Sequence, residues 1–83
     1  MSIIFVSALP FKISESELRG LFAPFGRIES IAIHADWENA SYEPYAHIKM
    51  ENAEKAINAL DGKMIQSTYL RVNTLVSLHA YEK

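Results

Sequence analysis

Cysteine is absent from this chain of 83 residues, and the formal net charge is only -2 at pH 7. Without cysteine there is no disulfide, no thiolate metal site and no thiol redox chemistry, and a reducing, cytoplasmic compartment is the simplest home. The apolar runs are short and broken by charges, and Met1 leads into a strand-like segment without the basic region of a signal peptide. We therefore expect a soluble protein that does not contact membranes, with the nucleus as the alternative location in a eukaryote.

The small net charge also limits the partners. Proteins dedicated to nucleic acids usually carry an excess of lysine and arginine, whereas here 8 such residues are outnumbered by 10 acidic ones. Attraction to phosphate can therefore be strong only if the cations gather on one side of the molecule. The length allows one small domain, in which every element must contribute to a single core.

Four segments alternate between apolar and polar residues, as half-buried strands do. In the third of them, small and aliphatic side chains alternate with Tyr45, His47 and Lys49, so that two rings and a cation share one face. Exposure to water alone does not require rings on this face, and the combination suits stacking on bases beside a phosphate. The four predicted strands are Ile3 to Leu9, Arg27 to His34, Glu43 to Met50 and Tyr69 to Asn73.

Two further segments have helical periodicity. Ser14 is followed three residues later by Glu17, the spacing of a capping box, and an apolar stripe comes after it. The second helix is expected to begin after Asn52, as its N-cap, and to end before Gly62. Between this helix and the last strand, Met64 to Thr68 is predicted to be irregular or to form a hairpin.

The predicted order is strand, helix, strand, strand, helix, strand. This indicates an α+β fold with ferredoxin-like β-α-β-β-α-β topology, in which a four-stranded antiparallel sheet carries two helices on one face. Right-handed crossovers make the first and third strands central, so Phe5, Tyr45 and His47 become neighbours on the open face. The domain is expected to span residues 1–74, and residues 75–83 form a tail that is apolar but fits neither strand nor helix periodicity.

Several segments resemble the RNA recognition motif family, and the resemblance extends from Ile3 to about Asn73. The family's hexapeptide on the first strand is similar to Ile4-Phe5-Val6-Ser7-Ala8-Leu9, and its octapeptide on the third strand is similar to Glu43 to Met50. Residues 21–26, 53–62 and 70–73 are each similar to the family's pattern at their places. The resemblance implies the same β-α-β-β-α-β fold and an RNA-binding function.

By this resemblance, Phe5 and Tyr45 fall on two base-stacking positions, and His47 falls on a third, where Phe or Tyr is usual. An imidazole still stacks, although it offers less area. Glu43 stands where the family normally has Arg or Lys on a phosphate, and Pro44 replaces a usual glycine. We therefore expect binding that is weak or that needs help from other cations.

The resulting interpretation is a domain that binds single-stranded RNA, or single-stranded DNA, and holds roughly two to four nucleotides with modest sequence preference. Lys12 and Arg27 could supply further cations around the sheet, whereas Asp36 and Glu38 would weaken phosphate binding. Trp37, in the loop before the third strand, is either a base contact or packed on its own loop. The predicted RNA-binding residues are Phe5, Tyr45, His47, Lys49, Arg71, Asn73 and Trp37.

The C-terminal tail provides the main alternative. If Leu75 to Tyr81 folded across the open sheet, these residues would hide Phe5 and Tyr45, and the face would become a gated, homodimer-forming or protein-binding surface. A peptide-binding branch of the family uses an Arg-x-Phe signature before the last strand. This chain has Ser67-Thr68-Tyr69 there, so we discount that branch.

No enzymatic, metal or cofactor function is predicted. Acylphosphatases share the strand order but need a phosphate-cradling loop with a catalytic arginine after the first strand, which Ser7 to Lys12 does not provide. No nucleophile is paired with a base. His34, His47 and His79 lack the spacing of metal ligands.

Overall fold

The computed structural model describes residues 2–74, and Met1 and residues 75–83 lie outside the described range. The alternative in which residues 75–81 fold across the open sheet therefore concerns residues outside the described range. The elements, in chain order, are β1 (Ser2–Ser7), α1 (Glu15–Phe22), the 3-10 helix η1 (Ala23–Phe25), β2 (Ile28–His34), β3 (Tyr45–Met50), α2 (Ala53–Leu60), β4 (Met64–Ile65), β5 (Thr68–Tyr69) and β6 (Arg71–Thr74).

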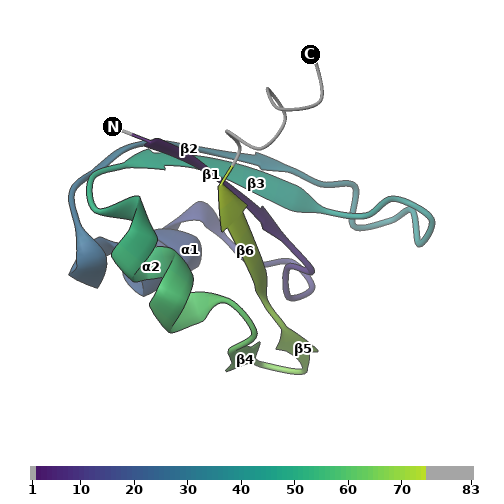
Figure 1. Cartoon of the computed structure of the whole chain (residues 1–83). Helices are drawn as coiled ribbons and strands as arrows, with labels where there is room; N and C mark the ends of the chain where they lie inside the picture. The colour runs from purple at the N-terminus through teal and green to yellow at the C-terminus, as the bar shows by residue number, and fades with distance from the viewer. Residues whose placement is uncertain (1, 75–83) are drawn as a thin grey trace, which may run out of the picture.

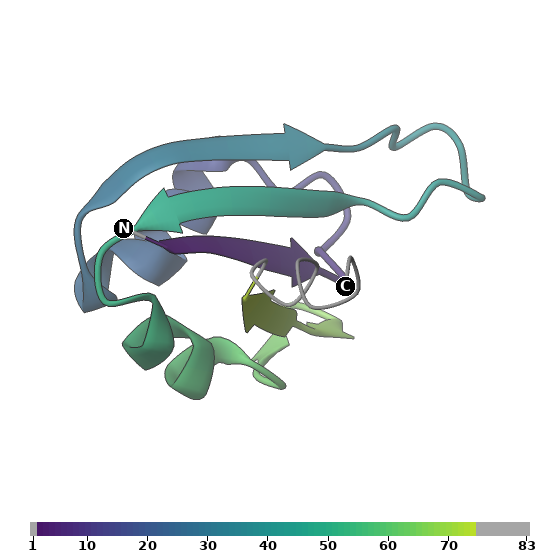
Figure 2. The same ribbon diagram turned by 45° about the horizontal axis from the view of Figure 1, so that its top comes forward.

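The main sheet has the strand order β2-β3-β1-β6, and each pair of neighbours is antiparallel. Both helices lie on the same side of it (Figure 1), and the predicted α+β, ferredoxin-like fold is confirmed. β1 and β3 occupy the centre, as predicted from the two crossovers. The loop between β2 and β3, residues 35–44, extends beyond the sheet (Figure 2).

The core lies between the sheet and the two helices. It is made by the side chains that alternate inward along the central strands and by the apolar stripes of α1 and α2. Burial of these side chains from water is the main force that holds the two layers together. The residues with no exposed surface are Ile4, Val6, Leu18, Phe22, Ala46, Ile48, Met50, Ala56, Leu70 and Val72.

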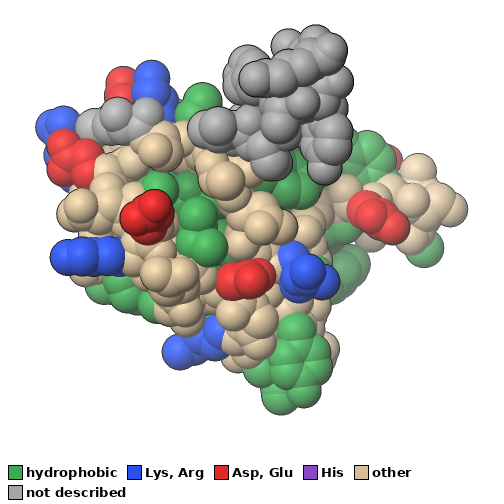
Figure 3. Space-filling model, in the orientation of Figure 1, with side chains coloured by type: hydrophobic (Ala, Val, Ile, Leu, Met, Phe, Trp, Pro, Cys, Tyr) green, Lys and Arg blue, Asp and Glu red, His purple; other side chains and the backbone are tan. Residues whose placement is uncertain are grey.

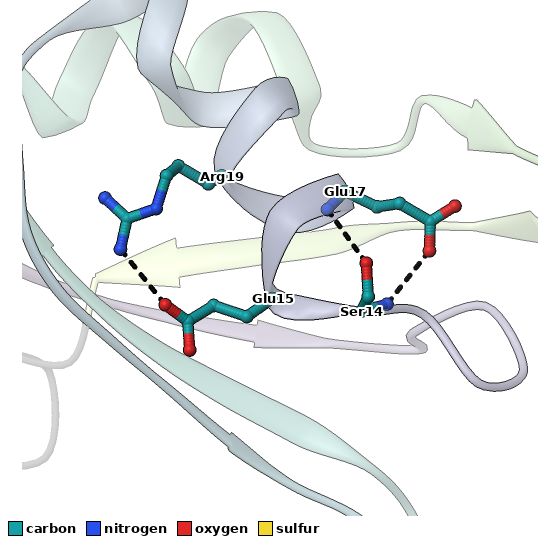
Figure 4. Close-up of polar contacts among 4 residues, drawn as sticks. All are labelled: Ser14, Glu15, Glu17 and Arg19. Carbon is teal, nitrogen blue, oxygen red and sulfur yellow. Dashed lines mark hydrogen bonds and ion pairs between the residues drawn. The ribbon is translucent and has the colours of Figure 1, made fainter.

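The predicted capping box starts α1. The Ser14 hydroxyl accepts a hydrogen bond from the backbone N–H of Glu17 at 3.1 Å, and the Glu17 carboxylate accepts one from the backbone N–H of Ser14 at 2.9 Å (Figure 4). Two of the backbone donors that a helix start leaves unpaired are thereby satisfied. One turn further on, Arg19 forms an ion pair with Glu15 at 3.1 Å.

The predicted N-cap of α2 is confirmed, but it caps the helix in an unusual way. Asn52 has the left-handed conformation (φ 57°, ψ 40°), and its side chain makes no capping hydrogen bond. The backbone is crowded at this turn, because a Cβ on Gly26 would overlap the carbonyl oxygen of Glu51. Asn tolerates the left-handed region better than most residues. An asparagine therefore suits this position because of its backbone conformation rather than because of a side-chain cap.

β1 and β3 each have one boundary that differs from the prediction by two residues. β3 begins at Tyr45, so Glu43 and Pro44 belong to the preceding loop; proline cannot donate a hydrogen bond to a strand ladder. β1 ends at Ser7, because Ala8 has a positive φ of 56°.

The last predicted strand is divided in two. Tyr69 was predicted as the first residue of the last strand of the main sheet, but it belongs to β5, which forms a separate hairpin with β4. Leu70, between β5 and β6, exchanges backbone hydrogen bonds with Gly62 and Lys63 at the end of α2. The chain therefore enters the main sheet only at Arg71, and the hairpin that was one of two expectations for Met64 to Thr68 is present.

Candidate nucleic-acid interface

Strand register places the predicted stacking residues next to one another on the sheet. Phe5 of β1 lies opposite His47 of β3. The edge strands extend the same rows, because His34 of β2 lies opposite Tyr45, and Asn73 of β6 lies opposite Phe5. Directly opposed residues of antiparallel strands share a face, and the residues next to these along each strand fill the core. This face is therefore the one turned away from both helices.

Four rings on this face form a connected surface, which we name the ring platform: Phe5, His34, Tyr45 and His47. The ring centroids of Phe5 lie 5.3 Å from Tyr45 and 5.8 Å from His47, and those two rings lie 5.4 Å apart. His34 stacks on Tyr45 at 4.8 Å with an angle of 22° between the ring planes. Such distances are those of favourable aromatic pairs.

The ring platform is not part of the buried core. Phe5, Tyr45 and His47 are half-buried, and His34 is exposed. Flat rings on a sheet present π-faces, on which nucleobases of any sequence can stack.

His34 was not predicted as part of this surface. Sequence alternation placed it on the outer face of its strand, but we considered it only as a metal ligand. Its position opposite Tyr45 depends on the β2–β3 register, which includes an irregularity between Ile28 and Ser30. The sequence pattern gives no direct sign of that irregularity, because a bulge changes which residues are opposed without changing residue types.

A hollow of about 470 Å³ adjoins the ring platform where β1 ends and β3 begins. Phe5 and Tyr45 line one side of it, and Glu43 and Pro44 also contribute to its wall. Glu43, whose charge is opposite to the one usual at its place in the family, is exposed and stands next to Tyr45 at the edge of the platform.

The two cations predicted to bind phosphate have acidic partners. Lys49 Nζ lies 3.7 Å from Glu29 Oε1, and Arg71 Nε lies 3.8 Å from Asp61 Oδ1. Asp61 Oδ1 also accepts a hydrogen bond at 2.9 Å from the backbone N–H of a β6 residue, which fixes this carboxylate at the sheet edge. Exposed pairs of this kind contribute about 0 to 1 kcal/mol, so a phosphate can replace the carboxylate at little cost.

The charge distribution is mixed rather than basic. On the side of the molecule seen in Figure 3, Lys and Arg side chains are interspersed with Asp and Glu and form no continuous basic area. Arg27 forms an ion pair with Glu51 at 3.4 Å. Glu51 directly follows the last residue of β3, whereas Tyr45 is the first residue of that strand, so this ion pair lies far from Tyr45.

Asn73 and Trp37 differ in their relation to the ring platform. Asn73 is exposed beside Phe5. Trp37 lies off the platform in the β2–β3 loop, where its ring meets Phe11 of the β1–α1 loop edge-on, at 5.6 Å and 74°. Six of the seven predicted residues therefore lie on strands of the main sheet, whereas Trp37 lies in a loop outside it. The six are Phe5, Tyr45, His47, Lys49, Arg71 and Asn73.

Two other findings concern the part of the chain that the structure describes. Residues 2–74 contain no group of three or more His, Asp or Glu side chains placed to hold a metal ion. No helix among them is long and apolar enough to cross a membrane.

Comparison with known proteins gives consistent matches. The model of the RNA recognition motif family matches residues 4–71. Multiple RNA-binding domain-containing protein 1 of Emericella nidulans is 33% identical over 72 residues, which are 83% of this chain and 9% of that protein. Poly(U)-binding-splicing factor rnp-6 of Caenorhabditis elegans is 34% identical over 79 residues, or 92% of this chain and 10% of that protein. The chain thus spans about a tenth of the length of these relatives.

Solved structures agree with the fold. The two Sex-lethal RNA recognition domains of Drosophila melanogaster match with a TM-score of 0.78 and 25% identity, over 90% of this chain and 50% of theirs. A Sex-lethal protein in complex with RNA matches with a TM-score of 0.74 and 26% identity, over 87% of this chain and 46% of that one.

Proposed function

Because the chain belongs to the RNA recognition motif family, we propose that it is a single-stranded RNA-binding domain that holds about two to four nucleotides on its open sheet face. The observation that carries this proposal is the contact among Phe5, Tyr45 and His47, whose ring centroids lie 5.3 to 5.8 Å apart on the face without helices. Each base stacked on such a ring contributes about 1 to 3 kcal/mol.

His34 extends the same surface toward β2. Since its ring stacks on Tyr45 at 4.8 Å, it holds Tyr45 in place and offers a further ring at the edge of the platform. Three polar side chains act beside the rings. Lys49 and Arg71 exchange their carboxylate partners for phosphate, and the Asn73 amide hydrogen-bonds the edge of the base stacked on Phe5.

Glu43 limits the affinity. Its carboxylate lines the hollow beside Tyr45, where it repels a phosphate between stacked bases. We therefore propose weak binding with a shallow salt dependence, because few counterions are released when few phosphates are neutralised.

The proposed RNA-binding unit is residues 1–74, and it acts by binding rather than by catalysis, as is general in this family. One relative is named a poly(U)-binding splicing factor, which favours uridine-rich RNA as a first ligand and supports the nucleus over the cytoplasm as the place of action. Trp37 lies outside this proposal, because Asp36 and Glu38 share its surroundings and disfavour phosphate.

A titration by fluorescence anisotropy tests the proposal. Short labelled oligouridylate and random-sequence RNA should bind at low salt, with double-stranded RNA of the same length binding more weakly, because paired bases cannot stack on the rings. Single-stranded DNA of matching sequence shows whether the 2′-hydroxyl contributes. Equal affinity for duplex and single strand would contradict base stacking as the mode of binding.

A further inference from the structure

A second aromatic pair lies where the β1–α1 loop meets the β2–β3 loop. Phe11 is 66% exposed, which is unusual for so large an apolar side chain, and its ring stands against Trp37 at 74°. Trp37 in turn packs against the core, so its position is fixed. Two rings at this angle form a corner in which a ligand can touch both.

The corner opens into a pocket of about 370 Å³. Asp36, Glu38 and Tyr42 line it together with the two rings, and none of its lining residues is basic. Asp36 accepts a hydrogen bond from the backbone N–H of Glu38, which keeps the carboxylate in place. Within residues 2–74, neither Asp36 nor Glu38 has an ion-pair partner, whereas Lys49 and Arg71 on the sheet do.

Aromatic faces and unpaired carboxylates both favour a cation. The π-face of a ring attracts positive charge, and this attraction grows when the cation is shielded from water. The chain already makes such a contact, since Lys12 Nζ lies 5.5 Å from the centroid of the Phe11 ring. Lys12 itself does not line the pocket, whose two acidic side chains leave it negatively charged, and this disfavours a phosphate.

We propose that this pocket, the Phe11–Trp37 pocket, binds an arginine side chain of a protein partner. A planar guanidinium can lie against a ring and at the same time direct its N–H groups to a carboxylate, whereas an ammonium does this less well. Tyr42, which is 41% exposed, and Phe11 offer apolar contact to the residues beside the arginine.

The partner would sit next to bound RNA. Leu9 and Pro44 line both the Phe11–Trp37 pocket and the hollow beside the ring platform, so the two sites adjoin without sharing a ring. The inference does not depend on RNA binding, because none of the four platform rings lines the pocket.

Trp37 is the only tryptophan of the chain, so its fluorescence reports on the pocket directly. The probe is a capped pentapeptide with a central arginine between leucines, and its control carries citrulline, which keeps the shape of arginine without the charge. The arginine peptide should change Trp37 emission saturably and bind about tenfold more tightly than the citrulline peptide.

Asp36→Asn combined with Glu38→Gln should weaken binding of the arginine peptide by about tenfold, because the carboxylates lose their charge but keep their size. The matched control is Glu54→Gln, an exposed acid on α2 that does not line the pocket, and it should leave the affinity unchanged. Circular dichroism confirms that each variant is folded.

Three results would overturn the proposal. They are no response to the arginine peptide, equal affinity for arginine and citrulline peptides, or peptide binding that survives removal of both charges. If random-sequence RNA changes Trp37 emission instead, and does so more strongly in the Asp36→Asn, Glu38→Gln variant, the pocket is an RNA-binding site and not a protein-binding one. The Phe5→Ala, Tyr45→Ala double variant should keep peptide binding, so failure of the RNA proposal is distinguished from failure of this one.

Discussion

Replacing Phe5 and Tyr45 together by alanine should abolish most of the RNA affinity. Each ring stacked on a base contributes about 1 to 3 kcal/mol, which gives about 2 to 6 kcal/mol if the two rings act independently. Their centroids lie only 5.3 Å apart, so the two effects overlap and their sum overstates the loss. We expect about 2 to 4 kcal/mol, which is a loss of about 30-fold to 1,000-fold in affinity.

The same double variant should remain folded. Neither Phe5 nor Tyr45 belongs to the buried core, and their removal costs the contacts between rings on the sheet surface. Each such contact stabilises a protein by about 0.5 to 1.5 kcal/mol, and four of them involve Phe5 or Tyr45. Because these contacts share rings, their effects overlap, and we expect a loss of about 1 to 3 kcal/mol out of a typical 5 to 15 kcal/mol for a domain. Thermal unfolding followed by circular dichroism measures this difference.

The matched control removes one phenylalanine and one tyrosine elsewhere. Phe11 is 66% exposed and Tyr69 is 63% exposed, and neither lies on the ring platform. The Phe11→Ala, Tyr69→Ala variant should bind RNA within about twofold of the parent, because surface changes away from a contact have small effects. The reasoning is refuted if the Phe5, Tyr45 variant keeps the parent's affinity in anisotropy titrations at low salt, or if the control loses as much.

Three other predictions follow from charges and caps. Glu43→Arg should tighten RNA binding and steepen its salt dependence by about one phosphate, and an unchanged slope across salt concentrations would show that no phosphate lies there. Glu29→Gln removes the partner 3.7 Å from Lys49 and should raise the affinity about twofold to fivefold in the same titration, whereas a decrease would mean that Lys49 needs Glu29 to be positioned. Ser14→Ala removes half of the capping box and should lower the free energy of unfolding in urea by about 1 kcal/mol without affecting RNA binding; a loss of affinity would show that α1 also supports the interface.

The fold was predictable because its signals agree at every level. The capping box at Ser14, the alternation along β1 and β3, and right-handed crossovers together determine which strands are central and which face is open. The order of residues along the chain is therefore sufficient to place Phe5, Tyr45 and His47 side by side.

The remaining differences have local physical causes. Asn52 has the left-handed conformation, in a turn whose backbone passes close to Gly26, and its side chain makes no capping hydrogen bond. Tyr69 is not part of the main sheet. Its neighbour Leu70 exchanges backbone hydrogen bonds with Gly62 and Lys63, just after α2, and alternation of residue types cannot reveal this tertiary contact. His34 lies opposite Tyr45 on the ring platform because of the β2–β3 register, which includes an irregularity between Ile28 and Ser30.

The acidic partners of the cations were also beyond the sequence pattern. Lys49 and Arg71 were predicted on the correct face, but Glu29 and Asp61 come from other elements, and only the folded chain brings them within 4 Å. The same holds for the Phe11–Trp37 pocket, since its rings come from two loops that are distant in sequence.

The most direct test of the central claim is a chemical-shift titration of the isotope-labelled protein with a pool of short random-sequence RNA. The account predicts that the largest amide and aromatic shifts occur at Phe5, Tyr45, His47 and Asn73, with α1 and α2 nearly unchanged. Largest shifts on the two helices, or no shift on β1 and β3 while RNA is bound, would contradict it.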